Sequence, residues 1–589
     1  MNKTIKRIVS AIMALCIIFA AAVFGSPQMV HDAHAANQAV FTPPVSTMRI
    51  GLAFGTNAVA SANLQNADGM GSGFYFGFFH DREFVPIGAY TNATAISMMM
   101  DRNMTWHPDS REYREGTEGS VVVGVFHIQL DMPFDTYAEA RAEANLRTRQ
   151  NARSFVKYYR GRFFVCVGQY TTRDAAESAQ AAMNLTETSH ITAGSQHTIT
   201  VVETGTNNIL FEFDYGATRH LGVMPRSQRG VNPETWFRGN RYHGGFQYAR
   251  LTGGAITVVN FVNIEDYVKG VVPYEMPNNW PIEALKAQAV TARTFAMGRL
   301  DRYRAQGFDI CRTEHCQVYR GRGEANARTD TAVRETAGVY VTINGRLVGT
   351  YYASSNGGAS ENSENVWVSA YSHLRGVIDP FEAEIAYRIP NYHWEVSFTS
   401  EQITRRLRDR GFNVGQIVHM EVSEYSPTGN AIAVTMRDEN GRNWTFRRRN
   451  ELMTALGVRT QRFDIGERRW VSNFAGVGGI HVNSPGNRLP SRAYAVGSDG
   501  VSRPVTGGYM YAITGTNAVE RLITAPQTGG GGTIVGGGNG MIDGVFTIRG
   551  TGNGHNVGMS QWGAYAMASL HGKTYVEIIQ FYFTGVTVG

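Results

Sequence analysis

Runs of alternating apolar and polar residues predict short strands over most of the N-terminal third of the chain. From 49 to 106 the sequence is apolar and rich in glycine, and it shows no long helical periodicity. Between 119 and 204, strand-like and helix-like segments alternate. They are strand runs at 121–130, 155–159, 163–170 and 198–202, and helical segments that begin near Tyr137 and run from Arg173 to about Met183. This order predicts a small βαββαβ unit.

The C-terminal part of the chain has the pattern of a second, β-rich domain. Alternating runs occur at 255–262 and 339–343, and Asn-Gly pairs at 344–345 and 440–441 are typical of hairpin turns. From 466 to 540 the sequence resembles an insertion that ends in flexible, glycine-rich stretches. We therefore expect a mixed α+β, β-rich chain, in which the small βαββαβ unit precedes a larger domain with an insertion.

One clear helix is predicted within this second domain. Pro281 suits its first turn, and apolar residues then recur at spacings of three and four. These residues are Ile282, Leu285, Ala289, Ala292 and Ala296. Glu275 precedes the helix in the apolar setting VVPYEMP, where burial would raise the pKa of a carboxyl and keep it protonated, as a general acid requires. The alternative is that Glu275 caps the helix or forms a salt bridge at its start.

Composition and charge indicate how many domains the chain has and which macromolecules it is expected to bind. A chain of 589 residues with 43% hydrophobic content is long enough for about two to four domains. The net charge of +6 favours polyanions such as wall teichoic acids or anionic lipid. Basic residues are nevertheless scattered among acidic ones, and the tightest group, 447–449, is typical of a solvated turn. No nucleic acid partner is therefore expected.

The N-terminus has the pattern of a signal peptide. Lys3, Lys6 and Arg7 precede an apolar stretch at 8–24, and an Ala-His-Ala sequence follows at 33–35. We expect residues 1–36 to direct export and to be cleaved, which makes the protein extracellular or associated with the cell wall. The alternative is that the segment is retained and associates the protein with the membrane.

Four blocks of distinctive sequence follow one another along the C-terminal half. The first is EDYVKGVVPYEMP at 265–277 with WPIEALKAQAVTART at 280–294, and the second is DICRTEHCQVY at 309–319. The third comprises YYASSNGG at 351–358, ENSENVW at 361–367 and LRGV at 374–377. The fourth comprises RGTGNGH at 549–555, GMSQWGA at 558–564 and a helix and turn at 575–585. Together they resemble the SpoIID/LytB family of stage II sporulation protein D and amidase enhancers.

This resemblance implies a SpoIID-like catalytic domain at 205–589. In SpoIID-type lytic transglycosylases the glutamate of the matching Glu-Met-Pro is the catalytic acid, so the resemblance implies this role for Glu275. The implied reaction cleaves peptidoglycan glycan strands to 1,6-anhydro ends, in sporulation or cell-wall remodelling, and requires no cofactor. Substrate-binding positions are expected among polar and aromatic residues of the same blocks. They are Tyr274, Gln288, Arg293, Ser354, Ser355, Asn365, His555, Gln561 and Trp562.

Some of these positions have a structural alternative. His555 either lines the cleft or supports the neighbouring glycines by hydrogen bonding, and Gln561 and Trp562 belong either to the core or to a sugar platform. The fourth block also departs from the family pattern. Asn553 replaces a common aromatic residue and Asn556 replaces a common glycine.

The βαββαβ unit carries a second resemblance. The run FVCVGQY at 164–170, followed by Asp-Ala-Ala at 174–176, is similar to the SPOR domain, which implies binding of glycan strands stripped of stem peptides. A sheet-plus-helix domain without a ligand is the alternative. The predicted organisation is thus a β-rich region at 37–118, a SPOR-like domain at 119–204 and the SpoIID-like domain.

Three cysteines remain after the signal peptide. Cys166 lies in an apolar run and is expected to be a buried strand residue. Cys311, His315 and Cys316 form a compact set of soft ligands, and the family resemblance implies a structural zinc for this region. A disulfide between Cys311 and Cys316, or two free thiols, are the alternatives.

Two other functions remain open from the sequence. The first is a non-catalytic glycan-binding protein that activates a separate N-acetylmuramoyl-L-alanine amidase, as the LytB branch of the family suggests. The second is a zinc-dependent wall hydrolase centred on Cys311, His315 and Cys316. The expected partners are glycan strands in each case and a cell-wall amidase in the first.

Overall fold

The computed structural model describes residues 41–466 except 151, 152, 184, 186 and 252, four short strands between 494 and 523, and residues 541–589 except 543. The predicted signal peptide and most of the predicted insertion lie outside the described residues. Within the described residues, no helix combines the length and apolar composition that a membrane span requires.

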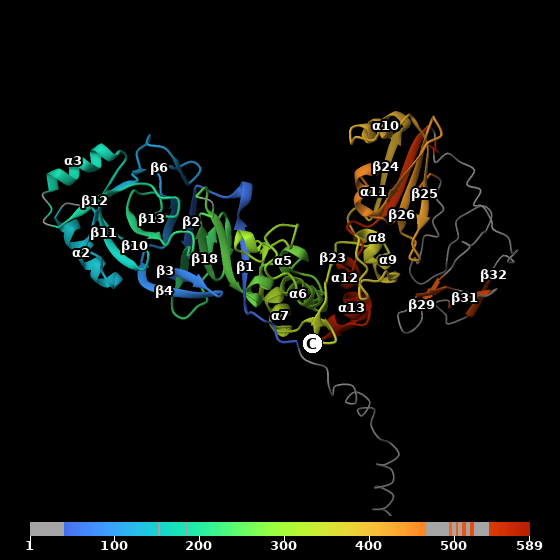
Figure 1. The fold of residues 1–589 in the computed structure, drawn as a ribbon. Helices are drawn as coiled ribbons and strands as arrows, with labels where there is room; N and C mark the ends of the chain where they lie inside the picture. Colours follow the sequence, from blue (N-terminus) through green and yellow to red (C-terminus); the bar gives the residue numbers. More distant parts are fainter. Residues whose placement is uncertain are drawn as a thin grey trace, which may run out of the picture.

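The protein is a mixed α+β, β-rich chain, as predicted, and two large sheets form its N-terminal part (Figure 1). The ten-stranded sheet has the order β12 (Ser189–Thr192), β9 (Phe126–Leu130), β11 (Arg162–Tyr170), β10 (Ser154–Tyr159), β14 (Ile209–Asp214), β13 (Ile199–Glu203), β5 (Ala95–Met100), β2 (Ser61–Asn66), β16 (Thr235–Phe237) and β17 (Asn240–Tyr242). The seven-stranded sheet has the order β20 (Ile310–Cys311), β1 (Thr47–Ala53), β19 (Thr257–Asn263), β18 (Gly245–Ala249), β15 (Leu221–Ser227), β3 (Gly71–His80) and β4 (Glu83–Thr91). A small sheet contains β6 (Met104–His107), β7 (Glu112–Glu115) and β8 (Val122–Val123).

The predicted βαββαβ unit is present, with α2 (Tyr137–Arg149) after β9 and α3 (Arg173–Met183) after β11. Its fourth strand is β12 and not the predicted 198–202, which forms β13 and pairs with β14 and β5. The sequence pattern does not mark β12 because Ile191 is its only large apolar residue. Since β10 pairs with β14, the unit shares one continuous sheet with the residues that flank 119–204. Cys166 is buried in β11, as expected.

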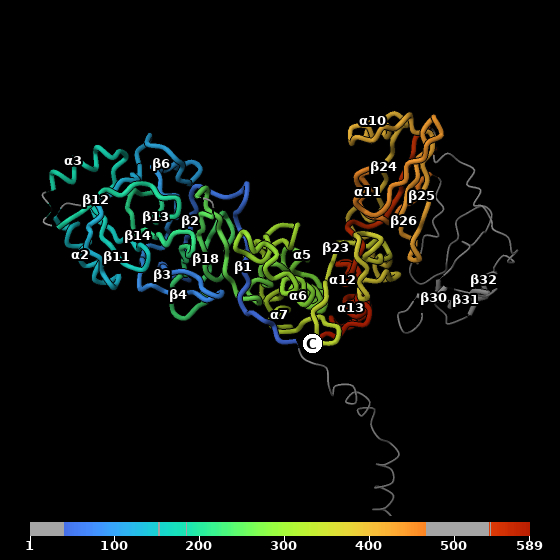
Figure 2. The backbone as a smooth tube through the Cα atoms, in the orientation of Figure 1, coloured from blue at the N-terminus to red at the C-terminus, as the bar shows by residue number. Residues whose placement is uncertain are grey.

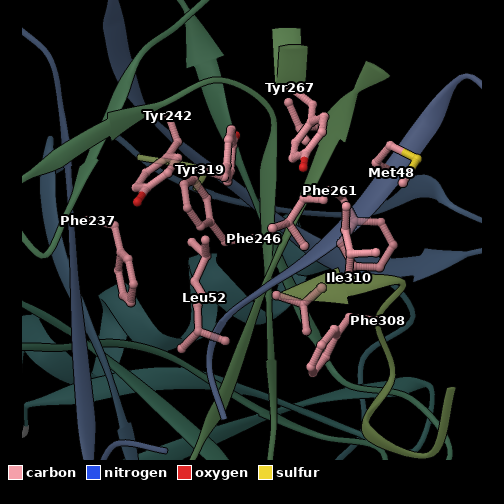
Figure 3. Packing of buried hydrophobic residues seen from close by; sticks show 14 of the residues in the cluster. Met48, Leu52, Phe237, Tyr242, Phe246, Phe261, Tyr267, Phe308, Ile310 and Tyr319 are labelled. Atoms are coloured by element: carbon pink, nitrogen blue, oxygen red, sulfur yellow. The ribbon is translucent and has the colours of Figure 1, made fainter. Parts of the chain in front are cut away.

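The first strand of the described chain completes the seven-stranded sheet. β1 pairs antiparallel with β19, where Arg49 lies opposite Phe261, and parallel with β20, where Ile50 lies opposite Ile310. Figure 3 shows Met48, Phe261 and Ile310 packed beside Phe308 and Tyr267. Met48 and Ile310, which are far apart in the sequence, therefore share one core.

A layer of helices follows the seven-stranded sheet. It contains α4 (Ile264–Lys269), α5 (Val272–Glu275), α6 (Ile282–Met297), α7 (Ala327–Glu335), α12 (Gln561–His571) and α13 (Tyr575–Tyr582). Helix α6 begins after Pro281, as predicted, but 13 of its 16 residues are buried because α4, α7, α12 and α13 all pack against it. It is thus a central helix, and its alanines allow its neighbours to approach closely.

Short helices and strands lie between the longer elements. They are η2 (Gly55–Asn57), η3 (Arg304–Gln306), β21 (Val341–Ile343), β22 (Arg346–Leu347), β23 (Tyr352–Ala353), α8 (Ser363–Val366), α9 (Pro380–Glu384), η4 (Ala386–Arg388), β35 (Met559–Ser560) and β36 (Thr587–Val588). The predicted Asn-Gly turn at 344–345 joins β21 to β22, and both of its residues have positive φ.

A further α+β part has its own core, built around Ile403, Phe446 and Ile548. Its elements are β24 (His393–Thr399), α10 (Ser400–Arg408), β25 (Ile417–Tyr425), β26 (Ala431–Asp438), β27 (Asn443–Arg447), α11 (Arg448–Leu456), β28 (Phe463–Ile465), β33 (Met541–Ile542) and β34 (Val545–Thr551). β28 and β34 are antiparallel neighbours and β33 pairs with β34, so the chain leaves this sheet after β28 and returns to it at β33. Figure 2 shows α10, α11, β24, β25 and β26 of this part grouped together. Between β28 and β33 in the sequence, β29 (Tyr494–Val496) pairs with β30 (Ser502–Pro504), and β31 (Tyr509–Ile513) with β32 (Val519–Ile523).

Candidate functional site

Glu275 lies at the C-terminal end of α5, and three segments that are distant in sequence donate hydrogen bonds to its carboxyl group. The backbone N–H of Val318 donates to Oε1 at 3.1 Å. The side chains of Tyr352, in β23, and Gln561, at the start of α12, also hydrogen-bond to the carboxyl. The fold therefore brings all four predicted sequence blocks to one half-buried carboxyl group.

The donors to Glu275 are themselves held by neighbouring polar groups. The Tyr267 hydroxyl donates to Gln317 Oε1 at 2.9 Å, and Gln317 Nε2 donates to the Tyr352 hydroxyl at 2.9 Å. The Tyr352 hydroxyl is thus left to donate its own proton toward Glu275. Val318, Tyr352, Gln317 and Tyr267 were not predicted as site residues, although all four lie within the quoted sequence blocks.

Burial raises the pKa of Glu275 above the ordinary value for a glutamate. The hydrogen bonds from Val318, Tyr352 and Gln561 oppose this shift because they stabilise the carboxylate, and the nearby charge of Glu314 adds to it. The upward direction agrees with the expectation from the apolar sequence around Glu275. All three donors are neutral groups, so the arrangement differs from the salt bridge that the sequence left open.

Several predicted substrate-binding residues lie close to Glu275. Gln561 donates from Nε2 to Gln288 Oε1 at 3.3 Å, so Gln288 positions Gln561 from within α6. Trp562 is half-buried, and its ring packs against that of Trp280 with centroids 4.7 Å apart. The backbone N–H of Trp562 donates to the backbone carbonyl of Ser354 at 3.1 Å. Tyr274 precedes Glu275 directly and accepts a hydrogen bond at its hydroxyl from the backbone N–H of residue 324 at 3.2 Å.

His555 lies beside β23 and contacts the rings of Tyr351 and Trp367, which also pack against each other. Burial lowers its pKa to about 4, so the imidazole is neutral at neutral pH, and Nδ1 accepts the backbone N–H of Val557 at 3.1 Å. The neighbouring Asn556 has a φ of 62°, in the left-handed region, and its Nδ2 donates to the backbone carbonyl of residue 356 at 2.9 Å. Asparagine is the non-glycine residue that best tolerates this conformation, which explains this departure from the family pattern.

Arg293 is enclosed within the protein. Its side chain is fully buried and binds Glu265 through Nε and Nη2, at 2.9 and 2.6 Å, and it also donates to the carbonyls of Val333 and Val339. We therefore correct the substrate-binding prediction and assign Arg293 to the packing of α6 against α4 and α7. The sequence block alone does not reveal which side of the helix the guanidinium occupies.

Ser355 and Asn365 are also engaged within the protein. Ser355 is buried and its hydroxyl donates to Glu382. Asn365 donates from Nδ2 to Glu361 Oε1 at 2.9 Å and accepts a bond from Gln461 at its carbonyl. These two residues, which were predicted to bind substrate, hydrogen-bond to neighbouring protein groups and not to Glu275.

The predicted zinc ligands do not converge. The Sγ atoms of Cys311 and Cys316 are 2.9 Å apart and both cysteines are free and buried, whereas His315 is exposed. The turn in which the Cys316 N–H donates to the Thr313 carbonyl, at 2.8 Å, leaves His315 on the solvent side. The hydrogen bond between the two sulfur atoms lowers the pKa of the Cys311 thiol to about 5 and raises the pKa of Cys316.

Of the residues that the structure describes, Asp101, His127 and Glu212 are the only three His, Cys, Asp or Glu residues with donor atoms within 4.8 Å of one another. All three are buried in the N-terminal sheets. His127 Nε2 is 3.2 Å from Glu212, and Lys157 Nζ is 3.4 Å from the other oxygen of that carboxylate. Because Lys157 already supplies a positive charge here, this is a buried ion network.

Comparison with known proteins matches this site to a family. Residues 252–343, which contain Glu275 and Val318, match the family model described as stage II sporulation protein. An uncharacterized protein of Brachyspira hyodysenteriae is 28% identical over 404 residues, which are 68% of this chain and 85% of that protein. The amidase enhancer of Bacillus subtilis is 28% identical over 54% of this chain, and stage II sporulation protein D of Bacillus subtilis is 31% identical over 25% of it. The matches span 40% and 47% of those two proteins.

Proposed function

We propose that this chain, which is similar to stage II sporulation protein D and to the amidase enhancer, is a peptidoglycan lytic transglycosylase with Glu275 as its acid and base. The observation that carries this proposal is the setting of Glu275. Its carboxyl is half-buried, its pKa is raised, and three neutral donors from separate segments fix its position. A general acid needs a raised pKa, and the fixed position allows it to meet the leaving oxygen.

The proposed reaction uses Glu275 in two successive steps. The protonated carboxyl first donates its proton to the glycosidic oxygen between N-acetylmuramic acid and N-acetylglucosamine, and the bond from that oxygen to C1 breaks. The resulting carboxylate then accepts the proton of the muramyl O6 hydroxyl as O6 forms a bond to C1, which gives the 1,6-anhydro end. Water does not enter the balance, and a single carboxyl suffices where hydrolytic glycosidases normally use two.

The donors around Glu275 support both steps. Burial favours the neutral acid before the first step. The N–H of Val318 and the side chains of Tyr352 and Gln561 favour the carboxylate that forms after it. Burial and the donors thus stabilise opposite forms of the same carboxyl, and a group that must serve as both acid and base needs both forms.

A second function is favoured by one relative. The amidase enhancer of Bacillus subtilis is similar over 54% of this chain, so the alternative is a glycan-binding protein that activates a cell-wall amidase without cleaving the glycan. In either case we propose that the protein is exported to the cell wall. We also propose that the βαββαβ unit binds glycan strands that lack stem peptides.

The test is mass spectrometry of the products that the purified protein releases from peptide-free glycan strands. We expect anhydromuramyl ends from the wild type and none from Glu275→Gln, with unchanged thermal unfolding. Glu324→Gln is the matched control, because this residue is exposed near Tyr274 and the substitution removes the same charge. Full cleavage by Glu275→Gln would refute the assignment. Binding without cleavage by all three proteins would favour the amidase activator.

A further inference from the structure

Two carboxyl groups, Asp379 and Glu382, are buried beside the site and have no part in the reaction proposed above. Both belong to the start of α9, where the Glu382 N–H donates to Asp379 Oδ1 at 3.2 Å. Their residues are 1% and 0% exposed. Leaving two acidic groups in the interior is unfavourable unless their oxygens are satisfied by hydrogen bonds, so their partners indicate what they stabilise.

Glu382 accepts four hydrogen bonds from two segments. The Ser355 hydroxyl and the Gly357 N–H, at 3.0 Å, donate to Oε1. The Asn356 N–H, at 3.0 Å, and the Ser560 hydroxyl, at 2.6 Å, donate to Oε2. Residues 355–357 follow β23, and Ser560 ends β35, so this one carboxyl group joins the ends of two strands.

Asp379 extends the same cluster. Its Oδ2 accepts Nδ2 of Asn356 at 2.8 Å and the hydroxyl of Tyr582, the last residue of α13, at 2.5 Å. The packing leaves no free space, because a Cβ added at Gly563 of α12 would lie 1.8 Å from the Tyr582 hydroxyl and 2.5 Å from Asp379 Oδ2. The cluster therefore fixes β23, β35, α9, α12 and α13 relative to one another.

The joined segments are those that carry two of the donors to Glu275. Tyr352 lies three residues before Ser355, and Gln561 directly follows Ser560. β23 and β35 pair over only two residues each, Tyr352 with Met559 and Ala353 with Ser560, which is too short to fix their separation alone.

We propose that Glu382, supported by Asp379, is a positioning residue for Glu275, because it holds β23 and the start of α12 at the separation that lets Tyr352 and Gln561 both reach the Glu275 carboxyl. This proposal rests on the proposed function of Glu275. α12 packs against both α6 and α9 (Figure 1). A change at Glu382 would therefore displace the start of α12, and with it Gln561, relative to Glu275.

A carboxylate suits this task better than an amide. Its two oxygens offer about four acceptor sites, and all four are used by Glu382. Glutamine keeps one acceptor oxygen and places an NH2 donor group where two donors now point. Glu382→Gln therefore breaks about two of the four bonds without changing side-chain volume.

The test compares Glu382→Gln with Glu384→Gln, a control on the same helix whose carboxylate lies outside the cluster and pairs with His571 at 2.9 Å. We expect kcat of Glu382→Gln to fall about 10- to 100-fold with little change in KM, because the acid is misplaced and not the substrate. The alkaline limb of the pH–rate profile should also move to higher pH, because the bonds from Tyr352 and Gln561 that lower the pKa of Glu275 are weakened. Val318 and Glu314, which also shift this pKa, are unaltered.

A folded Glu382→Gln variant with wild-type kcat and an unshifted profile would overturn the proposal. If that variant does not fold, Ser355→Ala removes a single bond to Glu382 and should give smaller changes in the same directions; no change there would also overturn it. Hydrogen–deuterium exchange of 351–357 and 558–563 separates this proposal from the proposed function. Faster exchange in Glu382→Gln than in Glu384→Gln supports the positioning role of Glu382 even if the wild type cleaves nothing, and equal exchange refutes it.

Discussion

Replacing Arg293 by methionine should destabilise the fold without directly weakening glycan binding. The guanidinium makes a bidentate pair with Glu265 and donates to the carbonyls of Val333 and Val339, and its side chain is 0% exposed. Removing one partner of a buried ion pair typically costs about 3–5 kcal/mol. The Glu265 side chain is 24% exposed and can regain water, so we expect the lower end, about 3 kcal/mol.

The assay is urea or thermal unfolding followed by tryptophan fluorescence, with glycan pull-down in parallel. A loss of about 3 kcal/mol corresponds to a fall in Tm of roughly 6–12 °C for a domain of this size. Glu265→Met should also destabilise, and the Arg293→Met/Glu265→Met double variant should lose less than the sum of the single losses, because the two groups interact. A loss below about 1 kcal/mol together with weakened glycan binding would refute this reasoning and restore a substrate-binding role.

Two further predictions concern titration and thiol chemistry. Since burial raises the pKa of Glu275 and the acid form starts the reaction, kcat/KM should fall as pH rises through that raised pKa; a rate that keeps increasing on the alkaline side would contradict a general-acid role. Because the Sγ atoms of Cys311 and Cys316 lie 2.9 Å apart, glutathione disulfide should oxidise this pair to one intramolecular disulfide, with glutathione as the reduced product, and leave Cys166 as a thiol. Peptide mass spectrometry checks the pairing, and a stable mixed disulfide at Cys166 would contradict it.

The sequence was informative where local pattern and structure coincide. The helical segments that became α2 and α3, and the start of α6 after Pro281, follow from capping and periodicity. β12 was missed because a strand with one large apolar residue has no periodic pattern, and its position is set by pairing with β9. Tertiary pairing also decides that the unit is continuous with its neighbours in one sheet.

In the candidate site, too, local sequence predicts some residues and tertiary contacts determine the others. Glu275 could be predicted as a candidate from the sequence because its apolar neighbours and its sequence block both point to it. Glu382 was not, because its role depends on Ser355 and Ser560, which are separated from it by 27 and 178 residues. Arg293 was misassigned because membership in the same block says nothing about which side of α6 a residue occupies. Contacts between distant segments therefore determine the parts of the site that local pattern leaves undefined.

The position of β1 limits how this protein can be divided into fragments. A fragment that begins at 205, the predicted start of the second domain, would lack β1 and leave β19 and β20 with no strand between them. Both would then expose unpaired backbone groups, and such edges promote aggregation. β14 would also lose its neighbours β10 and β13, β15 would lose β3, and β16 would lose β2. A deletion series intended to isolate activity should therefore retain the N-terminal strands, β1 included, and a fragment from 205 should be less soluble than the full chain.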